Sequence, residues 1–208
     1  MTFEDAFASF ASRLAPFGVA FGAREIQPGD EAAFRDGALE STPANLARRR
    51  ASGAARILAA QMFGRFGLDD AKVGRAVGGA PIWPPGFIGS IAHDDTTAIV
   101  AFARSGGPIQ ALGVDIEPAA PLPDDLADFV LTGSERRLPA GDPLARRKIF
   151  AAKEAVYKAV HPLDGTPLEY ADIVCDADLG GATLRDGRRL ALVATSAPCV
   201  AAAAFIPS

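Results

Sequence analysis

The chain has 208 residues, of which 49% are hydrophobic and 22% are charged. This balance is ordinary for a globular protein and supplies a core for one domain or for two closely packed halves. The formal net charge of −4 excludes a general electrostatic attraction to nucleic acid or to an anionic membrane. The longest apolar runs fall short of the ~20 residues that span a bilayer, and the acidic N-terminus does not fit a signal peptide. We therefore expect a cytoplasmic protein.

Hydrophobic spacing and turn residues predict most elements of the first half. Residues 3–14 predict a helix, and residues 18–23 predict a strand. A segment rich in glycine and proline at 74–89 predicts a loop. Two short strands are expected within 90–103, separated by a turn at 93–96.

A long helix is expected between this first strand and the glycine-rich loop. Ser41 or Thr42 is suited to cap its first turn, and Pro43 fits the first helical position. The pattern continues to about Phe63.

The second half begins after a Ser-Gly-Gly-Pro junction at 105–108. A strand is predicted over 109–117, followed by a proline-broken connector. Next come a short helix that contains Glu135, with Thr132 or Ser134 as its cap, and a helix over 143–160 with Asp142 as its cap. The last predicted elements are strands over 168–174, 189–195 and 198–206. Each half thus supplies helices and a few strands, which predicts an α+β fold rather than a βαβ arrangement.

The two cysteines lie in apolar, strand-like surroundings. Cys175 and Cys199 lack the C-x-x-C spacing that is typical of metal and redox sites. We expect buried free thiols rather than a disulfide or a ligand pair.

The run Gly-Val-Asp-Ile-Glu-Pro at 113–118 places two acids in a predicted strand. Side chains two residues apart on a strand share a face. Asp115 and Glu117 therefore point one way, whereas Val114 and Ile116 point the other way.

The run Phe-Ala-Ala-Lys-Glu-Ala-Val-Tyr-Lys at 150–158 predicts a helix. Glu154 and Lys158 are four residues apart and share a face of it. If this helix packs over the acidic strand, three carboxylates and one ammonium converge, which suits Mg²⁺ and a phosphate. The alternative is a solvated strand edge and a surface Glu–Lys pair.

Two further groups of residues could contact an anion. Ser90 and His93 follow a glycine- and proline-rich segment whose backbone could approach a ligand closely. Arg49 and Arg56 are seven residues apart on the predicted first-half helix, about two turns, and can share a face. The alternatives are a satisfied histidine and a solvated basic helix face.

Three motifs together resemble the 4′-phosphopantetheinyl transferase superfamily. They are the runs at 113–117 and 150–158 and the segment Trp-Pro-x-Gly-x-x-Gly-Ser-Ile-x-His at 83–93. More narrowly, they are similar to the siderophore-synthetase (enterobactin-type) branch of the single-chain, pseudo-dimeric group. The motifs come in the family's order along the chain.

The resemblance implies a reaction and an architecture. Coenzyme A donates its 4′-phosphopantetheine arm to a serine of an apo acyl or peptidyl carrier protein, Mg²⁺ is required, and adenosine 3′,5′-bisphosphate is released. The carrier belongs to a peptide synthetase, a polyketide synthase or a fatty-acid system. Two similar α+β halves, residues 1–106 and 107–208, pack as a pseudo-dimer in a monomeric protein, with coenzyme A in the cleft between them.

The resemblance also assigns roles to residues. Asp115, Glu117 and Glu154 are the implied metal ligands; Lys153 and Lys158 contact phosphate; Ser90, His93, Arg49 and Arg56 bind the coenzyme; and Glu154, Lys158 and Glu135 are catalytic. The general base is left open among Glu154, Glu135 and a water on the metal.

The sequence departs from the family's pattern in two places. The arginine-rich helix usually reads Gly-Arg-x-x-Ala-Arg, whereas here residues 53–56 read Gly-Ala-Ala-Arg. A basic residue that often precedes the tryptophan–proline loop is replaced by Gly79, so Arg75 or Lys72 is the candidate substitute.

Two alternative functions use the same cleft. One is a non-catalytic protein that binds coenzyme A or a nucleotide, and the other is a Mg²⁺-dependent phosphohydrolase with water as acceptor. For the transferase, opposite charges favour encounter with acidic carrier helices. The candidate docking residues are Arg136, Arg137, Arg146 and Arg147.

Overall fold

The computed structural model describes residues 4–34, 45–76, 79–137, 141–165 and 167–208. Its helical elements in chain order are η1 (Glu4–Phe7), α1 (Ala8–Leu14), η2 (Ala15–Phe17), η3 (Asp30–Phe34), α2 (Leu46–Gly64), α3 (Asp124–Val130), η4 (Glu135–Arg137), α4 (Ala145–Asp164) and η5 (Tyr170–Asp172). Its strands are β1 (Ala20–Glu25), β2 (Gly74–Arg75), β3 (Pro81–Ile82), β4 (Phe87–His93), β5 (Thr97–Arg104), β6 (Ile109–Glu117), β7 (Ile173–Cys175), β8 (Gly181–Leu184), β9 (Arg189–Thr195) and β10 (Val200–Pro207).

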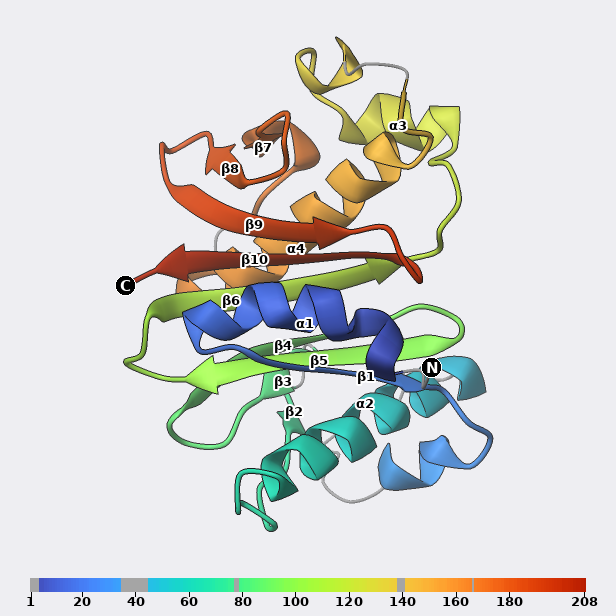
Figure 1. Cartoon of the computed structure of the whole chain (residues 1–208), viewed down its shortest axis with the longest axis vertical. Helices are drawn as coiled ribbons and strands as arrows, with labels where there is room; N and C mark the ends of the chain where they lie inside the picture. The colour runs from blue at the N-terminus through green and yellow to red at the C-terminus, as the bar shows by residue number, and fades with distance from the viewer. Residues whose placement is uncertain (1–3, 35–44, 77–78, 138–140, 166) are drawn as a thin grey trace.

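The strands form one main sheet in each half of the chain (Figure 1). The first sheet has the order β1-β5-β4, and the second has the order β6-β10-β9-β8-β7, while β2 and β3 pair as a short ribbon. Strand pairing in both sheets is antiparallel. The α+β class and the two sheet-rich halves are thereby confirmed. The boundary at residues 106 and 107 and the pseudo-dimeric relation stay predictions.

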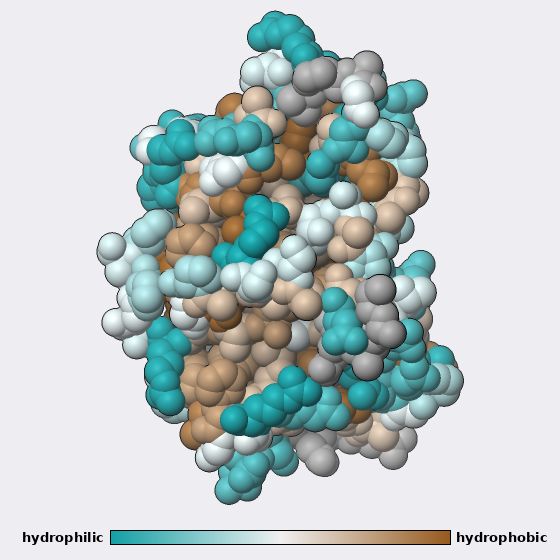
Figure 2. All heavy atoms as spheres, viewed as in Figure 1, coloured by the Kyte–Doolittle hydropathy of each residue, from teal (hydrophilic) through white to brown (hydrophobic). Residues whose placement is uncertain are grey.

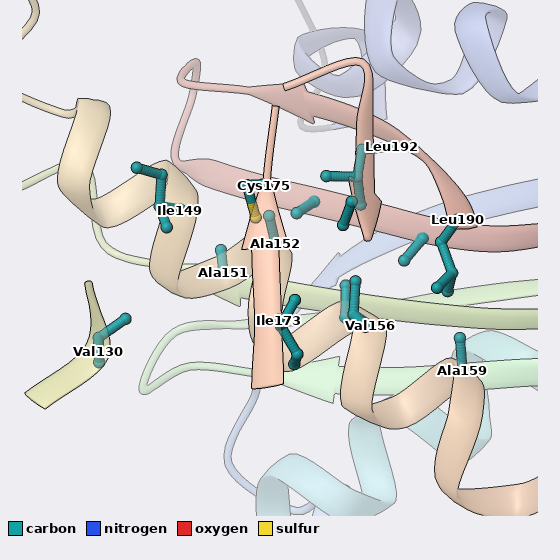
Figure 3. Close-up of a cluster of buried hydrophobic side chains, with 14 of the residues drawn as sticks. Val130, Ile149, Ala151, Ala152, Val156, Ala159, Ile173, Cys175, Leu190 and Leu192 are labelled. Atoms are coloured by element: carbon teal, nitrogen blue, oxygen red, sulfur yellow. The ribbon is translucent and has the colours of Figure 1, made fainter. Parts of the chain in front are cut away.

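Helix α4 covers one face of the second sheet. Ile149, Ala152 and Val156 are buried at helical spacing on it and form one apolar stripe. Figure 3 shows this stripe beside side chains of β7 and β9, such as Ile173 and Leu192, in one hydrophobic cluster. The packing fixes the position of α4 along the sheet.

The central strand β10 has small side chains on both faces. Ala202 and Ala204 belong to the core under α4, whereas Ala201 and Ala203 belong to the core on the opposite face. This is the alternation that a strand requires. All four are fully buried, and their small volume lets α4 behind the sheet and α1 in front of it pack closely (Figure 1).

The core on the α1 face is shared by the two halves. It includes Phe10 of α1, Ile99 of the first sheet and Phe205 of the second. Helix α2 covers the other face of the first sheet through a separate cluster with Leu58 and Phe63. The two sheets are therefore joined by a common hydrophobic core rather than by a linker alone.

The surface is hydrophilic at its margins and more apolar toward the middle of the face in Figure 2. Among large hydrophobic side chains, Phe129 of α3 is 73% exposed. Within the described ranges, we find no helix with the length and apolar character to cross a membrane.

Several predicted elements of the first half are confirmed, with shifted ends. Residues 4–14 are helical, and the first strand lies two residues later than expected, as β1. The predicted pair of strands is the β4–β5 hairpin, in which Asp94 Oδ1 accepts from the backbone N–H groups of Thr96 and Thr97. The loop expected over 74–89 was wrong in part, because it contains the β2–β3 ribbon and the start of β4.

The start of α2 also differs from the expectation. The predicted caps Ser41 and Thr42, with Pro43, lie outside the described residues. The helix begins at Leu46, and the side chain of Asn45 accepts from the N–H of Ala47 at 2.8 Å. Asparagine is as effective a cap as serine, and the helix ends at Gly64, close to the predicted end.

In the second half, β6 has the predicted bounds, but the connector after it contains α3, which we did not expect. Acidic residues Asp124 and Asp125 occupy its first turn, where they interact favourably with the helix dipole. Helix α4 begins at Ala145 and continues past Pro162. It ends at Asp164, and Gly165, with a left-handed φ of 67°, is the C-cap.

The strand predicted over 168–174 was largely wrong. Glu169 and Asp172 form a capping box that favours a helical turn, η5, over residues that otherwise read as a strand. β7 therefore begins only at Ile173, and β8 was not predicted. β9 is confirmed, and β10 begins two residues later than expected.

Gly113 marks the closest approach of β6 and α4. A Cβ at this position would lie 1.9 Å from the carbonyl oxygen of Ala155 and 2.6 Å from the N atom of Ala159. Both are backbone atoms of a packed helix, so they cannot move aside cheaply. Glycine at this position lets the acidic strand lie directly under the helix.

We predict that Gly113→Ala lowers the free energy of unfolding by about 3 kcal/mol or more, because the methyl group forces α4 away from β6. Urea denaturation measures the change. Gly133→Ala is the matched control, since no described atom beyond the adjacent residues lies within 4 Å of the added methyl group. Equal effects of the two substitutions would contradict the close contact.

Candidate active site

Strand β6 directs its two acids toward α4. Asp115 pairs with Ala202 of β10, and Val114 pairs with Ala203. Ala202 belongs to the core under α4, whereas Val114 and Ile116 belong to the core on the other face. The predicted division of the strand, with both carboxylates on one side, is confirmed.

Helix α4 supplies the charged groups that meet these acids. Arg147, Glu154 and Lys158 are separated by seven and four residues, so they lie on one helix face. Lys158 Nζ is 2.6 Å from Asp115 Oδ1, and Arg147 Nη1 is 2.8 Å from Glu117 Oε2. The predicted approach of the helix to the acidic strand is therefore present.

Each of the three carboxylates has one oxygen held by a donor of the second half. Lys158 holds Asp115, Arg147 holds Glu117, and the hydroxyl of Tyr170 donates to Glu154 Oε1. The second oxygen of Asp115, Oδ2, is buried and has no hydrogen-bond partner in the part of the chain that the structure describes. An orphaned anionic oxygen is costly, and it points to a missing cation or donor.

The raised pKa of Asp115 agrees with a missing cation or donor at this position. Burial raises the pKa of its carboxyl from an ordinary 3.8 to about 7, and the charges of Glu117 and Glu154 act in the same direction. Lys158 opposes the rise but does not cancel it. When all three acids are ionised, the site has three carboxylates and only two paired cations, Lys158 and Arg147.

The pKa values of the neighbouring groups Glu117 and Tyr170 are raised as well. Burial also raises the pKa of Glu117, against the opposing effect of Arg147. The pKa of Tyr170 is raised by burial, by its bond to Glu154 and by the charges of Asp115 and Glu117. Its phenol is consequently a neutral hydrogen-bond donor at physiological pH.

The three carboxylates fit a divalent cation by donor type and charge, but they do not form a closed cage. Across the described ranges we find no cluster of three His, Cys, Asp or Glu side chains in a geometry that could hold a metal ion. The unpaired Oδ2 of Asp115 and the excess negative charge are the observations that favour a cation here. A hard cation such as Mg²⁺ prefers oxygen donors of this kind and completes its shell with water or phosphate.

The first half reaches this site through the end of β4. The hydroxyl oxygen of Ser90 accepts from the backbone N–H of Val114 at 3.0 Å, and Ser90 is buried. Ser90 thereby joins β4 to β6 one residue before Asp115. His93 lies at the end of β4 and keeps an exposed edge. Partial desolvation and the charge of Lys158 lower its pKa, whereas the charge of Asp94 acts in the opposite direction.

The arginines of α2 are used in different ways. Arg48 also lowers the pKa of His93 through its charge. Arg49 has a buried Nε without a hydrogen-bond partner in the described part of the protein. Arg50 is bound to Glu31 at 2.9 Å and is therefore less available to a ligand.

Arg56 lies farther along α2 and faces another arginine. Its guanidinium donates to Ser52 Oγ at 2.6 Å and to the carbonyl of Gly74 at 3.2 Å. Burial and the charge of Arg75 lower its pKa. Gly79 makes room for Arg75, because a Cβ there would lie 2.9 Å from Arg75 Nη2. Arg75 thus lies beside Gly79 and interacts with Arg56 as a like charge.

Lys153 and Glu135 are not part of the acidic site. Lys153 is 0% exposed and Glu135 is 3% exposed, and their charged atoms are 2.7 Å apart. Lys153 also donates to the carbonyl groups of Val130 and Tyr170. A lysine so enclosed has no donor directed at a phosphate, so the role expected for it does not follow from this geometry.

The carboxylate of Glu135 is also fully engaged. Its oxygens accept from the backbone N–H of Thr132, the Thr132 hydroxyl and the backbone N–H of Cys175. Thr132 is thus a donor to Glu135 rather than the helix cap that we expected. This network leaves Glu135 poorly placed to take a proton from a substrate.

A cavity of about 440 Å³ lies beside this network, between η4, the start of α4 and the β7–β8 loop. Its lining includes Glu135, Lys148 and Asp176. The three site carboxylates and Lys158 are not among its lining residues, so we treat it as separate from the acidic site.

The arginines expected to dock a carrier protein differ in exposure. Arg147 is 9% exposed and also donates to the carbonyl groups of Ala120 and Pro121, so it holds the loop after β6 and is not a surface group. Arg136 and Arg146 are ion-paired with acids of α3. Arg137 remains an exposed cation.

Both cysteines are free, as expected, and no disulfide joins them. Cys175 is buried, but Cys199 is only partly buried, so the expectation of two buried thiols was right for one of them. Burial raises the pKa of each thiol to about 12, which keeps both protonated.

Sequence reasoning did not identify Tyr170 or the role of Arg147 in the site. Arg147 could have been found, because it lies seven residues before Glu154 on the same face of the helix. Tyr170 gave no such signal, since it comes from a separate turn after α4 and was assigned to a strand.

We predict a pH-dependent effect of Asp115→Asn on stability in metal-free buffer. The folded-state pKa lies above the unfolded value, so the stabilising contribution of Asp115 is present below about pH 4 and is lost as the pH rises through 7. The free energy of unfolding of the variant minus that of the wild type should rise over this interval by up to about 4 kcal/mol. Urea titrations with a chelator at pH 4 and pH 8 measure it. A difference that is constant or falls with pH would contradict the assignment.

Two family models match the chain. The 4′-phosphopantetheinyl transferase N-terminal domain matches residues 38–103, and the 4′-phosphopantetheinyl transferase superfamily model matches residues 111–199. The first contains Ser90, His93 and the arginines of α2, and the second contains the three carboxylates and Lys158.

The chain is also similar to characterised relatives. It is 38% identical over 138 residues to 4′-phosphopantetheinyl transferase Svp of Streptomyces mobaraensis. The matched region covers 62% of this chain and 56% of that relative. It is 36% identical over 145 residues to 4′-phosphopantetheinyl transferase Npt of Nocardia iowensis, covering 67% of this chain and 65% of the relative. Enterobactin synthase component D of Salmonella typhimurium is 38% identical to this chain over 85 residues. The matched region covers 38% of this chain and 34% of that relative. The chain thus spans between a third and two thirds of the length of these relatives.

Proposed function

The chain belongs to the 4′-phosphopantetheinyl transferase superfamily, and we propose that it transfers the 4′-phosphopantetheine arm of coenzyme A to a serine of an apo carrier protein. The observation that carries the proposal is the meeting of Asp115, Glu117 and Glu154 with Lys158 where α4 crosses β6. Carboxylates and an ammonium in one half-buried site suit a reaction on a polyphosphate. The similarity to enterobactin synthase component D favours a carrier of a siderophore peptide synthetase, with polyketide and fatty-acid carriers as the other classes.

Lys158 has the position to stabilise charge on the departing phosphate. Its side chain is 30% exposed, and among the described acids its ammonium is paired only with Asp115, through one oxygen, so it retains donors for a phosphate. The charge of Lys158 lowers the pKa of His93, and His93 is our candidate for a second donor, from the first half. A phosphate bound between these residues would touch both halves of the protein.

Glu154 is the residue we assign to accept the serine proton. Its Oε1 is held by Tyr170, which leaves Oε2 for the incoming hydroxyl or for a cation. Glu135 is less suited to this role, because it is buried in its ion pair with Lys153. A proton acceptor must lie within hydrogen-bond reach of the substrate.

Asp115, Glu117 and Glu154 would hold Mg²⁺, which when bound neutralises the pyrophosphate of coenzyme A and polarises the phosphorus. The orphaned Oδ2 of Asp115 supplies an anionic donor for it. Without such a cation, these carboxylates repel the substrate's phosphates.

Arg56 and Arg75 are our candidates for a second phosphate of the coenzyme. The positive charge of Arg75 lowers the pKa of Arg56, so the two side chains interact as like charges. Mutual repulsion favours binding of an anion between them. Arg48 and Arg49 lie nearer the start of α2, and the charge of Arg48 lowers the pKa of His93.

One assay separates the transferase from the two alternatives. The protein is incubated with coenzyme A, Mg²⁺ and an apo carrier protein, and the carrier is weighed by mass spectrometry. We expect the carrier to gain the mass of one phosphopantetheine group. Release of adenosine 3′,5′-bisphosphate without that gain would indicate a hydrolase, and neither product would indicate a binding protein.

We predict that Glu154→Gln lowers the transfer rate by about 100-fold or more, because an amide can neither accept the proton nor bind a cation as strongly. Glu25→Gln at the exposed end of β1 is the matched control and should retain full activity. Initial rates of carrier modification provide the measurement. Full activity of Glu154→Gln would exclude this scheme.

A further inference from the structure

Tyr170 contacts the acidic site from outside the sequence motifs that define it. It lies in the short turn η5, and its hydroxyl donates to Glu154 Oε1. We infer that Tyr170 is a positioning residue that holds Glu154 by one oxygen and keeps the other directed toward Asp115 and Glu117. The inference rests on the proposed role of these three carboxylates as the cation site.

The structure shows the bond between Tyr170 and Glu154 in place of an ion pair within the helix. Glu154 and Lys158 are four residues apart in the order that favours a Glu–Lys pair on a helix surface. In the structure, Lys158 instead binds Asp115 at 2.6 Å, while Glu154 is bound by Tyr170. The hydroxyl therefore supplies the donor that Glu154 would otherwise take from its own helix.

The arrangement also leaves one oxygen of Glu154 available. An ionised carboxylate only accepts hydrogen bonds, and it has two oxygens to do so. Tyr170 occupies Oε1 and so restricts a side chain with three rotatable torsions, which would otherwise lose entropy on binding a ligand. The same pattern, with one oxygen of each acid held, recurs at Asp115 and Glu117.

Tyr170 is itself fixed on several sides. Its carbonyl accepts from Lys153 Nζ at 2.9 Å, and Lys153 is anchored by Glu135. Its ring meets Phe129 edge-on at 5.5 Å and Phe150 at 5.9 Å. The buried Lys153–Glu135 pair thus lies outside the acidic site but supports it indirectly, because Lys153 holds the backbone of Tyr170.

The test is Tyr170→Phe, which removes the hydroxyl and keeps the ring. The control is Tyr157→Phe, the same change on α4 at a residue whose ring packs on His161. Mg²⁺ affinity is measured by titration calorimetry without coenzyme A, and thermal unfolding is measured in metal-free buffer. We expect Tyr170→Phe to weaken Mg²⁺ binding about tenfold, as loss of a group that orients a ligand does, with little change in the unfolding temperature. Tyr157→Phe should leave both unchanged.

The double variant separates positioning from a general structural effect. In a Glu154→Gln background, Tyr170→Phe should cause no further loss of Mg²⁺ affinity, because the bond it removes acts through Glu154. An additive loss would overturn the inference, as would wild-type affinity in the single variant or absence of Mg²⁺ binding by the wild type. If Mg²⁺ binding responds as expected but no carrier is modified, the proposed function fails while the positioning role of Tyr170 stands.

Discussion

The contact between α4 and β6 is the constraint on which the site depends. Gly113 has no side chain, so the strand lies against the helix backbone at Ala155. Two residues farther along, Asp115 meets Lys158, and Glu117 meets Arg147. The alanines of β10 allow the same close packing from the next strand. Apolar packing of small residues thus sets the separation at which the charged residues of the helix and the strand interact.

That packing leaves an electrostatic imbalance at the edge of the core. Burial of Asp115 beside Glu117 and Glu154 raises its pKa to about 7 despite Lys158. Native proteins rarely leave a buried carboxylate oxygen without a partner, and such groups cluster at functional sites. A bound cation would remove the imbalance, which explains how the same residues can be costly to the free protein and useful to the reaction.

The sequence was sufficient for the parts of the fold and site that depend on local spacing. The bounds of β6, the common face of Asp115 and Glu117, and the shared helix face of Glu154 and Lys158 all follow from strand and helix periodicity. Tyr170 was missed because its contact with Glu154 joins segments that periodicity cannot relate. The role expected of Lys153 depended on a similar contact, since only the folded chain shows its ammonium enclosed by Glu135 and two carbonyl groups.

The most direct test of the central claim is a crystal structure of the protein with coenzyme A and Mg²⁺. We predict the cation on Asp115, Glu117 and Glu154, with the pyrophosphate between it, Lys158 and His93. Tyr170 should keep its bond to Glu154. A coenzyme bound elsewhere, or a pyrophosphate held without contact to these carboxylates or to a cation on them, would contradict the account.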